Sequence, residues 1–237
     1  QRKGKTSTMS KRLKRFSLQL ESLPDEMLLE IFSYMDFQEL LLCSQVSKRI
    51  RAICSDKSYW EEMDLFGKRV KAEFIKSILD RNCELLIMRD TVIEGCVKLN
   101  RPSKLTHLEL TGWFHGSSTK DFYHEVLNSC YSLEVLVMNG VTHQLNIVFQ
   151  NLCKRNGQTL KEINLAECKW ITKSSVQGIT KNCTHLTEVN LRLVKMPPEA
   201  MDLLVSGLSP NVKKVNFASK YMNMRNSHIE ALLSRSH

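Results

Sequence analysis

A short apolar pattern recurs along the last three-quarters of the chain at an almost constant interval. The pattern has apolar residues at its first, fourth and sixth positions, and it occurs as LTHLEL, LEVLVM, LKEINL, LTEVNL and VKKVNF, starting at residues 105, 133, 160, 186 and 212. Successive starts are 28, 27, 26 and 26 residues apart. Two looser copies precede them, WEEMDL from residue 60 and CELLIM from residue 83. A fixed period of this length is typical of repeat architectures, so residues 60–237 are predicted to form a stack of similar units.

Each unit is predicted to contain one strand and one helix. The apolar pattern alternates as a half-buried strand does. Helix-period apolar residues follow in most units, namely Phe74, Ile75 and Ile78; Phe122, Val126 and Cys130; Val176, Ile179 and Cys183; Met201, Leu204 and Leu208; and Ile229, Leu232 and Leu233. Thr119 and Thr172 stand near two helix beginnings, where a hydroxyl can cap the helix. Because one unit cannot bury its apolar face alone, the units are expected to stack into an α/β solenoid, a curved parallel sheet with helices on its convex side.

The repeats resemble the leucine-rich repeat family, whose signature is L-x-x-L-x-L at this period. The segment INLAECKWITKSSVQGITKNCTHLTEVNL (163–191) is similar to the cysteine-containing subtype, with Cys168 after the strand and Cys183 before the next repeat. We interpret five repeats as clear and two as looser matches. Whether further repeats follow residue 237 stays open.

A second apolar region precedes the repeats. In LPDEMLLEIFSYM (23–35), a helix of about three turns is predicted from the helical spacing of Met27, Leu28, Ile31, Phe32 and Met35. The two segments that follow, FQELLLCSQVSKRI and RAICSDKSYW, are equally apolar. A bundle of about 40 residues is near the lower limit for independent folding. It is therefore expected to bury part of its surface on the first repeat and part on a partner.

Residues 23–60 resemble the F-box across nearly their full length. The matching features are Leu23-Pro24, Glu26, Leu28, Ile31-Phe32, Glu39-Leu40, Val46-Ser47-Lys48-Arg49, Asp56 and Trp60, and the departure is Ile50, where the family usually has an aromatic residue. The resemblance implies a three-helix module over residues 21–60 that docks onto the Skp-type adaptor of a cullin-RING ubiquitin ligase. It implies adaptor contacts by Leu23, Pro24, Leu28, Ile31, Phe32, Leu40 and Leu41. For Leu28 and Phe32, the alternative is a place in the intramolecular core.

An F-box that runs directly into YWEEMDL is most similar to the S-phase-kinase-associated F-box protein subfamily. The combination implies a substrate-recognition subunit of an SCF-type ligase, whose repeats hold a protein substrate for ubiquitination and proteasomal degradation in the nucleus or cytoplasm. Such a subunit would need no catalytic residue, metal or cofactor of its own. The alternative is a non-ligase scaffold whose N-terminal helices cap the solenoid. The substrate, its phosphorylation and the need for an accessory protein stay open.

The candidate substrate-binding surface is the concave face of the predicted sheet. The third and fifth positions of each pattern point away from the core, and the seventh extends that face. The candidates are Arg89, His107, Glu109, Asn164, Asn190, Arg192, Lys214 and Asn216. The three asparagines would stack across adjacent strands, either to hold an extended peptide or to bond only with one another and water. The basic side chains could receive a phosphate, although Glu109, Glu162 and Glu188 lie between them.

The net charge of +9 is concentrated in one short segment. Residues 1–20 carry seven Lys and Arg and no acid, which predicts a disordered basic tail. Within it, KRLKR (11–15) is either a nuclear import signal or a solvated stretch. The remaining 27 basic and 25 acidic residues nearly cancel, so nucleic-acid binding is not expected. No apolar run approaches the roughly 18 residues of a membrane helix, and membrane binding is not expected either.

The eight cysteines show no spacing typical of a zinc site or a redox pair. Without a secretory segment, a reducing compartment is expected, where cysteines serve as small buried apolar residues. Motifs for nucleotide binding, metal-dependent hydrolysis and serine hydrolysis are absent from the sequence. The sequence therefore indicates a binding protein rather than an enzyme.

Overall fold

The computed structural model describes residues 20–111, 119–218 and 225–234. The predicted basic tail, including KRLKR at 11–15, lies outside the described residues apart from Leu20. The chain divides between Tyr59 and Trp60 into two compact units, an N-terminal unit and a repeat unit.

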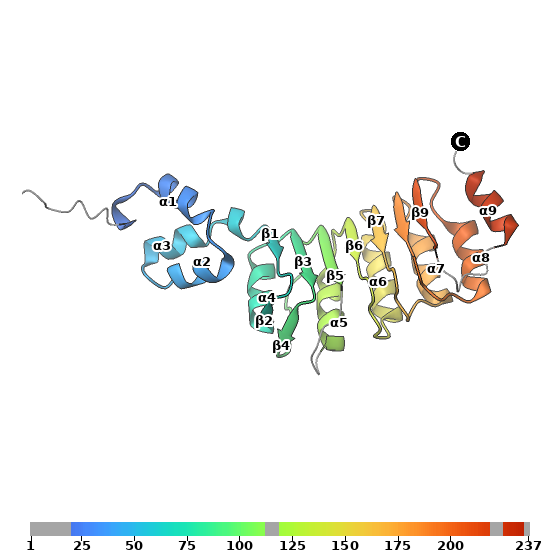
Figure 1. The fold of residues 1–237 in the computed structure, drawn as a ribbon, viewed down its shortest axis with the longest axis horizontal. Helices are drawn as coiled ribbons and strands as arrows, with labels where there is room; N and C mark the ends of the chain where they lie inside the picture. The colour runs from blue at the N-terminus through green and yellow to red at the C-terminus, as the bar shows by residue number, and fades with distance from the viewer. Residues whose placement is uncertain (1–19, 112–118, 219–224, 235–237) are drawn as a thin grey trace, which may run out of the picture. The chain divides into compact units, whose positions relative to one another are not determined.

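The N-terminal unit is helical (Figure 1). Its elements are η1 Leu20–Ser22, α1 Asp25–Phe32, α2 Phe37–Cys43, α3 Lys48–Cys54 and η2 Lys57–Tyr59. Helix α2 begins with a capping box, because Asp36 Oδ1 accepts the Gln38 and Glu39 N–H groups at 2.8 and 2.9 Å, and Glu39 Oε2 accepts the Asp36 N–H at 2.9 Å. Helix α3 begins at Ser47, whose Oγ accepts the Ile50 N–H at 3.2 Å.

Helix α1 is shorter than predicted. It ends at Phe32 instead of continuing to Met35, because Asp36 takes the extended conformation needed to cap α2. Of the predicted apolar stripe, only Leu28 and Phe32 are buried.

The core of the N-terminal unit comes from all three helices. Its fully or nearly fully buried side chains are Leu28, Phe32, Leu40, Ile50, Ile53 and Cys54. Ile50, which stands where an aromatic residue was expected, is 1% exposed and fills a core position. The Tyr59 hydroxyl donates to the Leu29 carbonyl at 2.6 Å and fastens η2 to α1. The predicted three-helix module is thus formed.

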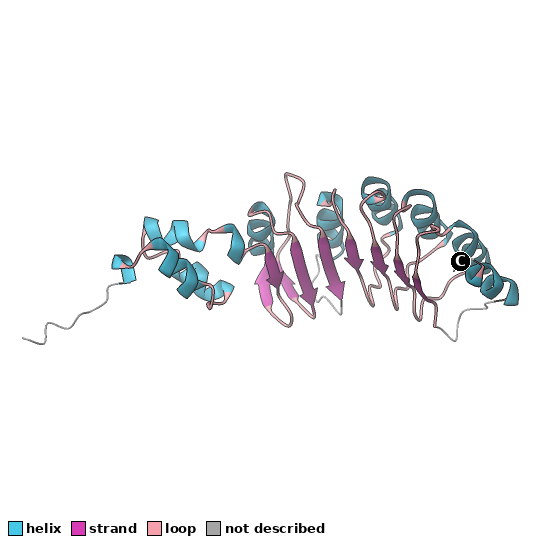
Figure 2. Ribbon diagram, turned by 90° about the horizontal axis from the view of Figure 1, so that it is seen from above, coloured by secondary structure: helices cyan, strands magenta, loops and turns pink. Residues whose placement is uncertain are grey.

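The repeat unit is a two-layer α/β structure, as predicted. Its described strands are β1 Glu62–Asp64, β2 Arg69–Lys71, β3 Leu85–Arg89, β4 Val92–Glu94, β5 His107–Thr111, β6 Val135–Val137, β7 Glu162–Asn164, β8 Glu188–Asn190 and β9 Lys214–Asn216. Its described helices are α4 Ala72–Asp80, α5 Thr119–Ser129, α6 Asn146–Asn156, α7 Lys173–Asn182, α8 Pro198–Gly207 and α9 Asn226–Leu233. The main sheet is parallel, in the order β1-β3-β5-β6-β7-β8-β9. Figure 2 shows the helices along one side of it.

The strands alternate between core and surface as the period of two predicts. In β5, Leu108 and Leu110 are fully buried, whereas His107, Glu109 and Thr111 are partly exposed. The last described strand departs from the pattern: all of β9 is exposed, including Val215 at 36%. The side chains that point from the sheet toward the core are therefore better buried in the middle of the sheet than at its last described strand.

Three features of the repeat unit depart from the prediction or were left unspecified. Strands β2 and β4 pair with each other in a separate two-stranded sheet. Helix α6 fits the plan of one helix in each unit, but none of its residues was identified from the sequence. Finally, residues 95–104 between β4 and β5 contain no helix in the structure, so this unit lacks the strand-plus-helix plan of the others.

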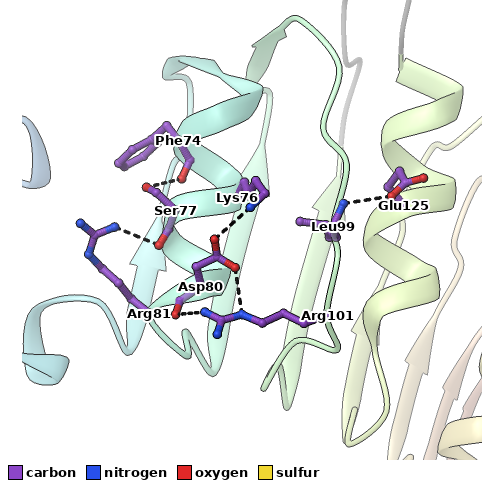
Figure 3. Close-up of polar contacts among 8 residues, drawn as sticks. All are labelled: Phe74, Lys76, Ser77, Asp80, Arg81, Leu99, Arg101 and Glu125. Carbon is purple, nitrogen blue, oxygen red and sulfur yellow. Dashed lines mark hydrogen bonds and ion pairs between the residues drawn. The ribbon is translucent and has the colours of Figure 1, made fainter.

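The segment 95–104 is held by side-chain contacts to the helices on either side of it (Figure 3). Arg101 Nε donates to Asp80 Oδ1 at 3.0 Å, and Arg101 Nη2 also bonds the Asp80 carbonyl oxygen. The Leu99 N–H donates to Glu125 Oε2 on α5 at 3.1 Å. Burial opposes ionisation of Asp80, but Lys76 and Arg101 outweigh it and lower the pKa of the carboxyl group. The segment therefore takes the place of a helix between α4 and α5.

Candidate functional site

The surface of the N-terminal unit exposes large apolar side chains. Six of them are between 40% and 82% exposed: Leu20, Met27, Ile31, Tyr34, Leu42 and Val46. Single exposed apolar residues are ordinary, but this number on so small a unit is typical of a protein-binding surface. We refer to these six residues as the exposed helical residues.

The predicted adaptor contacts separate into two groups. Leu28, Phe32 and Leu40 are at most 2% exposed. The prediction that these three residues contact the adaptor is wrong. They pack in the core, which was the alternative considered for Leu28 and Phe32, and leave no exposed surface for a partner. Pro24 and Ile31 are exposed, while Leu23 and Leu41 are half-buried, so these four remain available to a partner. Their contact with an adaptor stays a prediction.

Several accessible residues were missed among the candidates. Met27 belongs to the predicted apolar stripe but was not named as an adaptor contact, and it is 51% exposed. Tyr34, Leu42 and Val46 are the most exposed of the set. The early end of α1 explains Tyr34, since it lies beyond the helix in the turn before Asp36.

Arg49 fixes the start of the N-terminal unit onto α3. Its Nη2 donates to the Leu23 carbonyl oxygen at 2.6 Å and to Asp25 Oδ1 at 2.5 Å, and its Nε donates to the same carboxylate oxygen at 2.9 Å. Arg49 belongs to the sequence motif, but this positioning role was not predicted. Arg49 orients the Leu23-Pro24 segment, and both of these residues are predicted adaptor contacts that remain accessible.

The second candidate surface is the strand face, which we define by two rows of aligned residues on the exposed side of the main sheet. Strand register gives the first row as Glu62, Leu85, His107, Val135, Glu162, Glu188 and Lys214. It gives the second row as Asp64, Ile87, Glu109, Val137, Asn164, Asn190 and Asn216. The rows hold five carboxylates and one ammonium group, so this face is acidic.

The basic candidates on or beside the strand face are all paired with acids. Arg89 Nε lies 3.6 Å from Glu109 Oε1, and Arg89 Nη2 lies 3.8 Å from Asp64 Oδ2. The pairs of Arg192 with Glu167 and of Lys214 with Glu188 both have N–O distances of 2.5 Å. The hydrogen bond from Lys214 to Glu188 raises the pKa of Lys214. These cations are thus already neutralised locally.

The predicted asparagine row is formed. Asn164, Asn190 and Asn216 are aligned across β7, β8 and β9. Each side-chain carbonyl accepts the backbone N–H two residues later, at 3.0 to 3.2 Å. The asparagines therefore terminate their own strands and do not form a ladder through their carbonyl oxygens. Within the described residues, their side-chain NH₂ groups have no hydrogen-bond acceptor.

A hollow of about 300 Å³ lies on the strand face over β6 to β9. Its lining includes Val137, the three asparagines, and the charged side chains of Glu162, Glu188 and Lys214. Apolar, amide and acidic groups therefore meet at one place. His107, Glu109 and Arg89 lie on strands outside this lining.

Three buried cysteines are poorly suited to form a reactive thiolate. Burial raises the pKa of Cys83 and Cys168 to about 12 and that of Cys130 to about 11, so these thiols stay protonated at neutral pH. Cys43 is half-buried and Cys96 is exposed, which corrects the expectation that all eight are buried.

Residues 20–111, 119–218 and 225–234 contain no cluster of three or more His, Cys, Asp or Glu that could hold a metal ion. None of the helices described there is both long and apolar enough to cross a bilayer.

The three helices of the N-terminal unit, their caps and the exposed helical residues fall in one stretch of the chain. This stretch is similar to a known family. Residues 20–65 match the model of the F-box-like family. The match covers α1, α2 and α3 and reaches β1. This chain therefore carries an F-box-like domain at residues 20–65, which supports its identification as an F-box protein.

Proposed function

We propose that this chain is the substrate-recognition subunit of an SCF-type cullin-RING ubiquitin ligase. The F-box-like domain suggests adaptor binding in substrate recognition. In the proposal, the domain binds a Skp-type adaptor and, through it, the cullin and RING subunits. The repeat unit is proposed to be a leucine-rich-repeat solenoid of the S-phase-kinase-associated F-box type that binds a protein substrate.

The observation that carries the proposal is the set of exposed helical residues inside the matched segment. Met27, Ile31 and Tyr34 lie on or directly after α1, and Leu42 and Val46 lie at or directly after the end of α2. Burying apolar side chains of this size stabilises a complex by about 25 cal/mol for each Å² removed from water. A protein adaptor is a partner that would cover them.

The proposed mechanism is proximity. The receptor holds a substrate lysine close to a ubiquitin thioester made by other subunits, which replaces a bimolecular encounter by an effectively intramolecular one. The receptor itself would supply no catalytic side chain, metal or cofactor. The alternative, a scaffold whose N-terminal helices only cap the repeats, predicts no adaptor complex.

Co-expression with a Skp-type adaptor, followed by size-exclusion chromatography, tests the proposal. The wild-type chain is expected to elute as a 1:1 complex. Ile31→Lys is expected to weaken the complex at least about tenfold, because it places a charge at the centre of an apolar contact. The Leu23→Ala, Pro24→Ala double variant is expected to weaken it as well.

The matched control is Ile147→Lys on α6. Ile147 is 75% exposed and lies outside the F-box-like domain, so this variant is expected to bind as the wild type does. Thermal melting of each variant separates loss of binding from loss of folding. A folded wild-type chain that does not bind the adaptor would refute the proposed substrate-receptor function and favour the alternative, a scaffold whose N-terminal helices only cap the repeats.

We also propose that the protein works in the nucleus or cytoplasm, with KRLKR (11–15) as an import signal. Fusion of residues 1–20 to a fluorescent reporter tests this segment. Nuclear accumulation that is lost when the four basic residues become alanine supports the proposal, and an unchanged distribution contradicts it.

A further inference from the structure

The strand face has a charge pattern that selects one class of partner. We propose that it binds an extended, basic and unphosphorylated segment of a protein, with two basic side chains separated by apolar ones. This inference rests on the proposed function in that the segment would belong to the ligase substrate.

The acidic groups give the first argument. Glu62 and Glu162 lie in the first row of the strand face. In the described residues neither carboxylate has a hydrogen bond or a close ion pair, and Glu162 interacts only at longer range with Lys214, whose pKa it helps to raise. By contrast, Arg89, Arg192 and Lys214 each have an acidic partner. A phosphate would have to compete with those carboxylates, whereas a Lys or Arg side chain would gain unpaired ones. Charge complementarity therefore favours a basic ligand over a phosphorylated one.

The apolar groups give the second argument. Between Glu62 and Glu162 the first row has Leu85 and Val135 on either side of His107, and the second row has Ile87 and Val137 on either side of Glu109. All four apolar side chains are only partly buried. A ligand that reached both acids would have to cross this apolar surface, and apolar residues between its basic ones would bury it.

Strand geometry sets the spacing of the ligand. Glu62 and Glu162 are four strand intervals apart in the sheet order. With neighbouring strands about 4.8 Å apart, this distance is roughly 19 Å, which an extended peptide covers in about six residues. In an extended peptide, alternate side chains share a face. The expected ligand therefore presents basic, apolar, apolar and basic side chains at every second position.

The asparagine row gives the third argument. The carbonyl oxygens of Asn164, Asn190 and Asn216 are used within their own strands, but their NH₂ groups are free of acceptors in the described residues. These donors line the hollow together with Glu162. Asn164 lies beside Glu162, and Asn190 and Asn216 lie beyond it on β8 and β9. Their NH₂ groups suit the backbone carbonyl oxygens of a peptide that continues past Glu162 over these strands.

Fluorescence polarisation with the full chain tests the inference. The probe is the fluorescein-labelled peptide GKTVTVTKG, whose two lysines are six positions apart. We expect it to bind, to bind more weakly as salt is raised, and to lose affinity when both lysines are replaced by glutamate. Replacement of its first valine by phosphothreonine, on the side of the peptide that faces the strands, is expected to weaken binding through repulsion from the acidic face.

Variants of the chain locate the contact. Glu62→Gln and Glu162→Gln are each expected to weaken probe binding about two- to fivefold, as for exposed ion pairs, and the double variant about tenfold. Glu199→Gln is the matched control, because it removes the same charge from an exposed residue on α8, on the helical side. An unchanged affinity in the double variant, or tighter binding of the phosphorylated probe, would overturn the inference.

Carbodiimide cross-linking identifies the occupant of the face. The reagent joins a carboxylate to a lysine amine as an amide, and mass spectrometry reads the joined pair. A link between Glu162 and a probe lysine supports the inference. A link from Glu162 to Lys11 or Lys14 that excludes the probe would instead assign the face to the chain's own basic segment.

Measuring adaptor binding with the same protein preparation tests the ligase function separately from the peptide site on the strand face. A chain that binds the adaptor but not the probe loses only the inference about the strand face. A chain that binds the probe but not the adaptor loses the ligase function and keeps a basic-peptide site.

Discussion

Asn156 is a fully buried polar side chain that ties three segments of the repeat unit together. Its Oδ1 accepts the Leu133 N–H at 2.8 Å, and its Nδ2 donates to the carbonyl oxygens of Cys130 and Leu152 at 3.0 Å. The end of α5, the segment before β6 and the body of α6 are therefore held by one amide.

Asn156→Ala should be one of the most destabilising polar substitutions in the repeat unit. The substitution leaves the buried Leu133 N–H without its acceptor, which costs about 1–3 kcal/mol, whereas the Cys130 carbonyl keeps the Arg155 Nε donor at 3.4 Å. We expect the free energy of unfolding to fall by about 1–3 kcal/mol, measured by urea titration. Asn151→Ala, at an exposed position of the same helix, should change it by less than about 0.5 kcal/mol. Equal effects of the two variants would contradict this role for Asn156.

Single residues also show where sequence reasoning reached its limit at the candidate site. Helical spacing marked Met27, Leu28 and Ile31 alike, yet only Leu28 is buried. A short helix that packs against two neighbouring helices buries only a narrow stripe of side chains. The positions of those two helices decide which of its apolar residues stay exposed. On the strand face, by contrast, the period of two placed His107, Glu109 and the asparagines correctly. The salt bridges that neutralise Arg89, Arg192 and Lys214 depend on side-chain geometry that spacing does not specify.

At the scale of elements, regular repeats were predictable and exceptions were not. The strands β5 to β9 follow directly from the L-x-x-L-x-L pattern. A helix was expected in each unit, but the residues of α6 were not identified although Phe149 and Leu152 are buried, because this helix exposes Ile147 at 75% and buries Asn156. Strands β2 and β4 are three residues each, too short to show a period, and they form only by pairing with each other.

The segment 95–104 offers a test of how an irregular element is held. Arg101→Ala removes its contacts with the side chain and carbonyl oxygen of Asp80. The Arg101 side chain is 58% exposed, so the expected loss of global stability is at most about 1 kcal/mol. Local opening should increase more clearly, and amide hydrogen exchange within 96–104 should accelerate.

Lys104→Ala is the control for that measurement. Lys104 is exposed and makes no contact of this kind in the described residues, so its exchange pattern should match the wild type. Unchanged exchange in Arg101→Ala would mean that the Leu99–Glu125 bond and backbone packing suffice to hold the segment.

At the scale of the whole molecule, the proposed function assigns different tasks to the two units. The N-terminal unit has a small core and a surface with exposed apolar groups, whereas the repeat unit buries an apolar layer between its sheet and helices. The N-terminal unit should therefore be the less stable of the two units. A unit of about 40 residues buries little surface relative to its size and is marginal alone, while stacked repeats support one another through their interfaces.

Leu28→Ala should therefore unfold one unit and leave the other intact. Leu28 is 0% exposed, and truncating such a side chain costs about 2–5 kcal/mol, which is a large share of the stability of a small domain. Hydrogen exchange monitored by mass spectrometry should show rapid exchange throughout α1, α2 and α3, with β7 and β8 as protected as in the wild type. In the matched variant Leu165→Ala, also at a 0% exposed position, the loss of protection should appear in the repeat unit instead. If Leu28→Ala deprotected β7 and β8 to the same extent as α1, the two units would fold as one cooperative whole, and adaptor binding would then be coupled energetically to the strand face.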